Sequence, residues 1–121
     1  MTNTALALYQ FWSSFDIPAY TTDTVPDEQE LPYIVYSLVE TDPFESMTHY
    51  AQVFYRATSN TALLAKVDEI LAVFHNSGNS IRLECDSGYV VLRSPTVQLM
   101  TDEVPEIRYA YINMTINCYH I

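Results

Sequence analysis

Basic side chains are scarce in this chain of 121 residues. Five Lys and Arg residues stand against fifteen Asp and Glu residues, so the formal net charge is −10 at pH 7. No Lys or Arg precedes Arg56, whereas eight acidic residues do. Binding to nucleic-acid phosphates depends on Lys and Arg, because these displace counterions. Binding to an anionic membrane surface needs the same positive charge. The composition therefore argues against both kinds of binding protein.

Glycine is also rare, with two residues in the whole chain. Tight turns at positive φ and loops that cradle phosphate groups depend on glycine. We therefore expect long strands and helices joined by open loops, and no phosphate-binding loop. A glycine-flanked nucleophilic serine is missing as well, although a Ser/His/Asp site without that motif stays open from the sequence.

Cysteine and histidine are few, and their spacing matches no metal site. Cys85 and Cys118 lack the CxxC pattern, so we expect reduced thiols that pack as small apolar groups. A disulfide between neighbouring strands is the alternative. His49, His75 and His120 are scattered, and no HxxxH spacing brings two of them onto one helix face. The sequence therefore predicts no metal and no other cofactor.

Long apolar runs are missing too. The opening residues, MTNTALALYQFW, carry no positive side chain and are interrupted by Gln10, so we expect no signal peptide. No apolar run approaches the roughly 20 residues of a transmembrane helix. Apolar residues make up 49% of the chain and charged residues 17%. These fractions and the length predict one globular domain over residues 1–121.

Two amphipathic segments predict helices. Apolar residues recur at three- and four-residue steps over residues 4–15, and Pro18 prevents any continuation. The same period runs through TSNTALLAKVDEILAVFHNSG. There we expect a helix of about seventeen residues that begins after an N-cap at Ser59 and stops at residues 76–78.

Segments rich in β-branched and aromatic residues predict strands, and we place these at residues 32–40, 47–57, 80–85, 89–94, 96–100 and 107–121. The segment 96–100 is a short strand or an edge segment. The last strand has a period of two, with Ala110 and Ile112 beginning its apolar face. The element order predicts an α+β fold, a mainly antiparallel β-sheet with two α-helices packed on one face.

The other face of the last strand is polar and aromatic but uncharged. It includes Tyr109, Tyr111 and Asn113. Tyr and Asn tolerate both water and a protein neighbour, so this face is a candidate contact surface. A merely solvated sheet face is the alternative.

Three acidic loops are expected, at residues 16–31, 40–47 and 101–106. The first lacks the DxDxDG spacing of a calcium loop, so we interpret it as solvated. Loops on a rigid scaffold often carry interactions. The first two loops supply six candidate contact residues: Asp23, Asp27, Glu28, Glu30, Glu40 and Asp42.

The order of these segments resembles a known family. FDIPAY leads through an acidic stretch into LPYIVYSLV, and FYRATSNTALLAKVDEIL joins a strand to a helix. GYVVLRSPTVQLMTDEVPEIRYAYINMTINCY then closes the chain. Over residues 17–119 this pattern resembles the tail terminator proteins of long-tailed bacteriophages, also described as tail completion, minor capsid or head–tail joining proteins.

The resemblance implies a structural virion protein that has no enzymatic activity. It implies a homo-oligomeric ring, usually a hexamer, that caps the tail tube and joins it to the head connector at the neck. The ring is assembled in the cytoplasm of the bacterial host, and DNA passes through it without specific binding. Six copies at −10 carry a formal charge of −60, and an acidic lumen repels the phosphate backbone.

The candidate lumen or inter-subunit residues are the six loop acids and the three residues of the last strand named above. Other interpretations remain open from the sequence. One is a head–tail connector, or head completion, protein of the same neck region. Another is an acidic DNA mimic that inhibits a nucleic-acid enzyme, although mimicry needs acids spaced like phosphates. The last is an enzyme with an unrecognised site.

Overall fold

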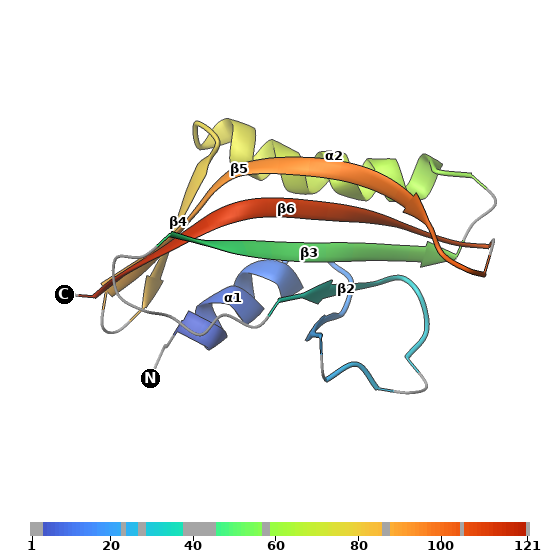
Figure 1. Ribbon diagram of the computed structural model, residues 1–121, viewed down its shortest axis with the longest axis horizontal. Coiled ribbons are helices and arrows are strands. Elements are labelled where there is room, and N and C mark those ends of the chain that lie inside the picture. The colour runs from blue at the N-terminus through green and yellow to red at the C-terminus, as the bar shows by residue number, and fades with distance from the viewer. Residues whose placement is uncertain are drawn as a thin grey trace.

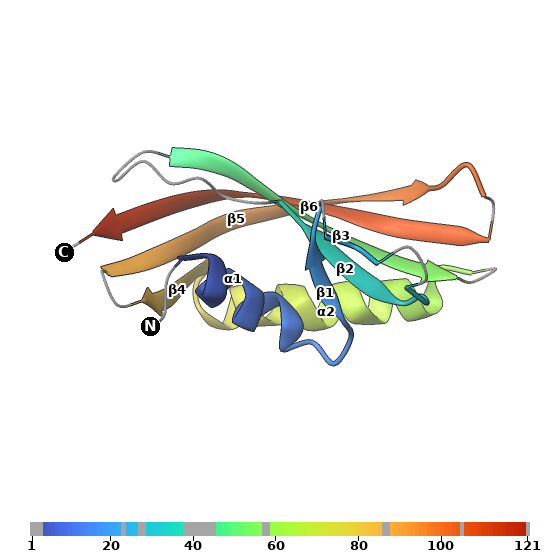
Figure 2. The same cartoon turned by 90° about the horizontal axis from the view of Figure 1, so that it is seen from below.

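The computed structural model describes residues 4–22, 24–26, 29–37, 46–56, 59–85, 88–104 and 106–120. Its elements, in chain order, are α1 (Thr4–Ser13), β1 (Ala19–Thr21), β2 (Tyr33–Tyr36), β3 (Ser46–Arg56), α2 (Thr61–Asn76), β4 (Ser80–Cys85), β5 (Gly88–Thr101) and β6 (Ile107–His120). The strands form one six-stranded sheet in the order β1-β2-β3-β6-β5-β4. The sheet is strongly twisted, and both helices lie on the same face of it (Figures 1 and 2). The predicted α+β class is confirmed.

The sheet is antiparallel except at one margin, where β1 runs parallel to β2 with Ala19 opposite Ile34. The main chain secures this contact, because the Ile34 amide donates a hydrogen bond to the Pro18 carbonyl oxygen at 2.8 Å. The prediction that all of residues 16–31 form a loop is therefore wrong, because residues 19–21 form β1. A strand of three residues is too short to show a period of two.

The core lies between the sheet and the two helices. The inward side chains of β6 are buried, and they are Ala110, Ile112, Met114, Ile116 and Cys118. The helices bury one stripe each against them, made of Leu8, Phe11 and Trp12 on α1 and of Leu63, Val67, Ile70 and Phe74 on α2. Each fully buried side chain of this size stabilises the fold by roughly 1.5–3 kcal/mol. The predicted alternation along the last strand is therefore confirmed.

The helix boundaries differ from the predicted ones in two places. The first helix ends at Ser13 instead of residue 15, and Asp16 then takes a φ of 66° that no helix allows. The N-cap of α2 is Asn60 rather than Ser59, and its side chain makes no capping hydrogen bond. The predicted stop is confirmed, because the C-cap is Ser77 and Gly78 follows in the left-handed region at φ +69°.

Two predicted strands merge into one. Residues 89–94 and 96–100 both belong to β5, which continues through a register shift between Arg93 and Thr96. Ser94 lies at this irregularity with φ 56°, and Pro95 follows it. A β-bulge of this kind bends a strand without ending it. Of the predicted acidic loops, residues 102–104 and 106 lie in the turn between β5 and β6, whereas residues 40–45 lie outside the described part of the chain.

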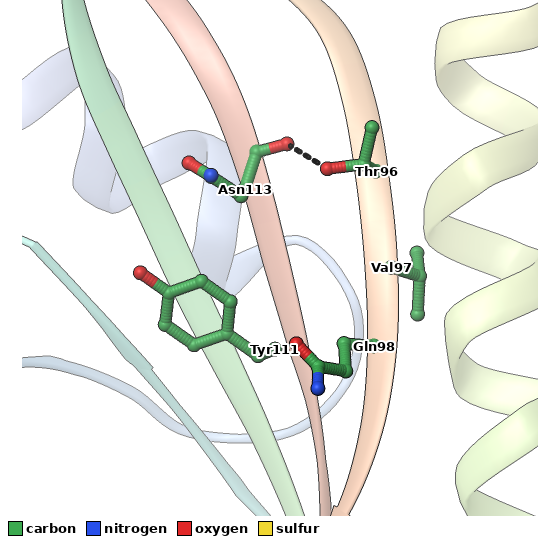
Figure 3. Close-up of a pocket in the computed structure, with 5 residues that line it drawn as sticks. All are labelled: Thr96, Val97, Gln98, Tyr111 and Asn113. Carbon is green, nitrogen blue, oxygen red and sulfur yellow. Dashed lines mark hydrogen bonds between the residues drawn. The ribbon is translucent and has the colours of Figure 1, made fainter.

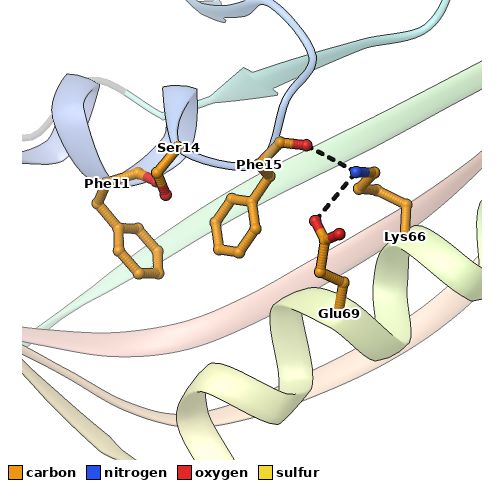
Figure 4. A network of polar contacts seen from close by, with 5 residues as sticks. All are labelled: Phe11, Ser14, Phe15, Lys66 and Glu69. Atoms are coloured by element: carbon orange, nitrogen blue, oxygen red, sulfur yellow. Dashed lines mark hydrogen bonds and ion pairs between the residues drawn. The ribbon is translucent and has the colours of Figure 1, made fainter.

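A polar contact links α2 to the residues just beyond α1. Lys66 of α2 donates a hydrogen bond from Nζ to the carbonyl oxygen of Phe15, at 2.6 Å, just beyond the end of α1 (Figure 4). The same Nζ lies 3.0 Å from Glu69 Oε2, one turn further along α2. The carbonyl groups at a helix end lack intrahelical partners and carry partial negative charge. The lysine therefore compensates a main-chain acceptor near the end of α1.

Candidate interaction surface

The side of the sheet opposite the helices, called the open face here, is not covered by any described helix (Figure 2). Strand alternation decides which residues reach it. On β6 these are Tyr109, Tyr111, Asn113, Thr115, Asn117 and Tyr119, and their register partners on β3 include Phe54, Gln52 and Tyr50. The sheet face that sequence alternation predicted is therefore present, and it continues across the neighbouring strands.

Aromatic rings form a row across four strands of the open face. Tyr20 of β1 lies 6.4 Å from Tyr33 of β2, measured between ring centroids. Tyr33 stacks on Phe54 of β3 at 5.3 Å, and Phe54 stacks on Tyr109 of β6 at 4.9 Å. Each such pair contributes about 0.5–1.5 kcal/mol beyond simple burial. The row therefore strengthens the pairing of these strands on the face of the sheet that no described helix covers.

Most charged residues of the open face lie near β4. Arg82 of β4 places its guanidinium carbon 3.8 Å from the ring centroid of Tyr89, which stacks on Tyr119 at 4.9 Å. Arg82 also pairs with Glu84 at 2.6 Å. Arg93 of β5 donates a hydrogen bond to the side-chain oxygen of Asn117. At the opposite end of the sheet, Arg56 of β3 follows the same alternation as Phe54 and lies 3.8 Å from Glu106. The described open face between these two ends is uncharged.

A shallow groove of about 390 Å³ crosses the uncharged part of the surface. It is lined by Thr96, Val97 and Gln98 of β5 and by Tyr111 and Asn113 of β6 (Figure 3). The Thr96 hydroxyl donates a hydrogen bond to the Asn113 carbonyl oxygen at 3.4 Å. The groove is lined by amides, hydroxyls, one aromatic ring and one valine. These groups suit an uncharged protein neighbour, and none of them would ionise near pH 7.

The predicted site residues are only partly placed by the structure. Tyr109 and Tyr111 lie half-buried on the open face, and Asn113 lies exposed beside the groove. Glu30 is exposed in the segment before β2. The other predicted acids lie outside the described residues, and they are Asp23, Asp27, Glu28, Glu40 and Asp42. Their place at a lumen or a contact remains a prediction.

Sequence reasoning missed Thr96 and Gln98, which complete the groove from β5. A signal was present, because residues 94–101 contain no charged residue in a chain of net charge −10. The bulge obscures this signal in the sequence, because the alternation of side chains changes phase between Arg93 and Thr96. The two halves of β5 therefore look like separate short strands.

One buried polar cluster lies on the helix side of the sheet. Trp12 donates its Nε1 hydrogen to His49 Nε2 at 3.0 Å, so His49 carries its own proton on Nδ1. That proton is donated to Ser37 Oγ at 2.8 Å, which also accepts the Tyr50 amide at 3.0 Å. Burial lowers the pKa of His49 to about 4. His49 is fully buried, so the cluster joins α1 to β2 and β3 and offers no catalytic base to a substrate.

The two cysteines are free thiols. Cys85 lies on β4 and Cys118 on β6, with β5 between them. Two strand spacings amount to about 10 Å, beyond the Cα separation of roughly 7 Å that a disulfide can span. The alternative of a disulfide between neighbouring strands is therefore wrong. Burial raises the pKa of the Cys118 thiol, which keeps it protonated and unreactive.

The described residues contain neither a metal-binding cluster nor a membrane-spanning helix. No group of three or more His, Cys, Asp and Glu side chains is placed to hold a metal ion within that part of the chain. Among the described helices none combines the length and the apolar character that crossing a membrane demands. No protein-family model matches the sequence, and no curated protein matches it.

Proposed function

We propose that this protein is a structural virion protein of the tail terminator type. In this role it forms a ring, of six copies by the resemblance, that caps the tail tube of a phage and joins it to the head connector. DNA passes through the ring, and no reaction is catalysed. The proposal rests on the resemblance over residues 17–119 and on one structural observation, the open face.

The open face supports an assembly role because of what it lacks. A solvated sheet face of an acidic protein normally carries charge, which keeps copies apart. Here the described acids lie in loops, in the turn between β5 and β6 and on α2, and Glu84 is the one described acid that a strand directs to the open face. Tyr, Asn, Gln and Thr side chains occupy most of it instead. Interface centres are depleted of charged residues and enriched in Tyr.

The charge of the chain supports the passage of DNA. A surface that is to let DNA slide must not neutralise its phosphates, because counterion release would hold the DNA in place. Three of the five Lys and Arg residues lie beside a carboxylate that offsets their charge: Arg56 beside Glu106, Lys66 beside Glu69 and Arg82 beside Glu84. A ring of such subunits presents little free positive charge to DNA.

Purified headless tails and tail-less heads of the parent phage test the proposal. We expect tagged protein to bind one end of the headless tails, seen as a cap in negative-stain electron microscopy. Binding to heads alone would favour the connector alternative, and binding to neither would overturn both.

A matched pair of variants tests the role of the open face. Asn113 on β6 and Gln10 on α1 are both exposed residues with uncharged amide side chains. We expect Asn113→Lys to abolish capping and ring formation, and Gln10→Lys to leave both intact. Equal behaviour of the two variants would contradict the use of the open face.

A further inference from the structure

The second half of β5 is a free sheet edge. β4 pairs with β5 as far as Arg93, and the Ser94 amide still bonds the Asn79 carbonyl oxygen at 3.0 Å. From Thr96 to Thr101, β5 pairs with β6 on one side and with none of the described strands on the other (Figure 1). Alternate residues of such an edge direct their N–H and C=O groups outward.

Beyond the bulge, the free run of this edge lacks three features that normally prevent association. Natural edge strands are blunted by charged residues, by prolines or by their shortness. Pro95 lies in the bulge, ahead of the free run, and residues 96–101 contain neither charge nor proline. Val97, Leu99 and Met100 are exposed by 37%, 42% and 38% of their surface. A strand of this composition is a template for adding another strand.

The flank of the edge is also apolar. Val97 points from β5 toward α2 (Figure 3), and Leu64 of α2 is 40% exposed. Leu64 lies about a third of a turn from the buried stripe of α2, on the side away from Lys66, and Lys66 faces α1. A strand added beside residues 96–101 would lie on the same side of β5 as β4, which pairs with residues 88–93. It would cover Val97 and Leu99 on the helix side.

We propose that this edge pairs with the same edge of a second copy, antiparallel and about a two-fold axis. The pairing would join two six-stranded sheets into one continuous sheet. The charge of the chain favours a second copy as the partner at this edge. A strongly acidic or basic partner protein gains no attraction from an uncharged strand. Two copies of net charge −10 can approach each other most closely where charge is missing. An uncharged strand of six residues is what the second copy supplies. A two-fold contact places each residue near its own counterpart.

This contact is separate from the proposed function. A two-fold contact closes on itself, whereas a ring requires head-to-tail contacts between different surfaces. A protein that forms rings without this contact keeps the proposed function and refutes the inference. A protein that forms two-fold dimers without rings does the reverse.

Two valines of equal exposure provide the first test. Val97 on β5 and Val73 on α2 are each 37% exposed. In sedimentation equilibrium, we expect Val97→Lys to weaken the dimer roughly tenfold or more, about 1.4 kcal/mol or more, and Val73→Lys to leave it unchanged. Circular dichroism checks that both variants fold. A wild type that shows no two-copy contact, or a dimer that Val97→Lys leaves intact, would overturn the inference.

Cysteine cross-linking tests the symmetry, and it works even inside a larger assembly. Single cysteines are placed in turn at each residue from Thr96 to Thr101, and an oxidant is added. A two-fold antiparallel contact brings at least one position opposite its own counterpart, so we expect a covalent dimer on a denaturing gel at that position. The wild type, with Cys85 and Cys118 in place, is the control. Failure at all six positions would exclude two-fold pairing of this edge.

Discussion

At the scale of single residues, His49 has a pKa far from the usual value of a histidine. A histidine normally titrates near pH 6.5, yet here burial lowers its pKa to about 4. Trp12 N–H is a donor only, so His49 Nε2 must stay unprotonated to accept it. A proton on Nε2 would make His49 and Trp12 two donors facing each other. It would also place a positive charge in the core, and this cost of burying the charge lowers the pKa of His49.

The expected consequence is an acid-dependent loss of stability. Between pH 6.5 and about 4, the unfolded chain binds a proton at His49 and the folded chain does not. The contribution of neutral His49 is thus complete above pH 6.5 and falls as the pH drops toward 4, by about 3 kcal/mol in the free energy of unfolding. Urea unfolding at pH 7 and pH 4, followed by Trp12 fluorescence, measures this fall.

His49→Gln is the matched control, because glutamine can still accept the Trp12 hydrogen bond but does not titrate. Carboxylates elsewhere contribute to the pH dependence of both proteins. We expect the wild type to lose about 3 kcal/mol more than the variant over this range. The same loss in both proteins would show that His49 is not the group responsible.

At the scale of elements, the sequence predicted what long periodic segments can reveal. The two helices, the hairpin of β4 and β5 and the alternation of β6 all follow from runs long enough to show a period. The parallel strand β1 has three residues, and the bulge of β5 shifts its alternation, so neither could be predicted from periodicity. The groove lies between the second half of β5 and β6, which meet only through sheet pairing.

The Lys66 contact between α2 and the end of α1 gives an element-scale prediction. The Lys66 side chain is 13% exposed, and Lys66→Met leaves the Phe15 carbonyl oxygen without this donor. We expect a loss of about 1–3 kcal/mol in the free energy of unfolding, measured by chemical denaturation. Arg56→Met is the control, because Arg56 meets Glu106 at 3.8 Å with both side chains more than half exposed. It should cost under about 1 kcal/mol, and equal losses would contradict the role of Lys66.

At the scale of the whole molecule, the distribution of charge and the arrangement of the helices both favour association through the open face. The helices cover one face of the sheet and leave the other with uncharged polar and aromatic side chains, while the described acids lie mostly in loops, turns and on α2. Repulsion between copies of net charge −10 opposes association. Assembly therefore has to use the surfaces from which charge is missing, and it should strengthen with added salt.

Electron microscopy of the purified protein, alone and with tail tubes, tests the central claim most directly. The account predicts closed rings of identical copies with a central hole, more abundant at high salt and seated on one end of the tubes. Monomers, or two-fold dimers and nothing larger, at every concentration and in the presence of tail tubes would contradict it.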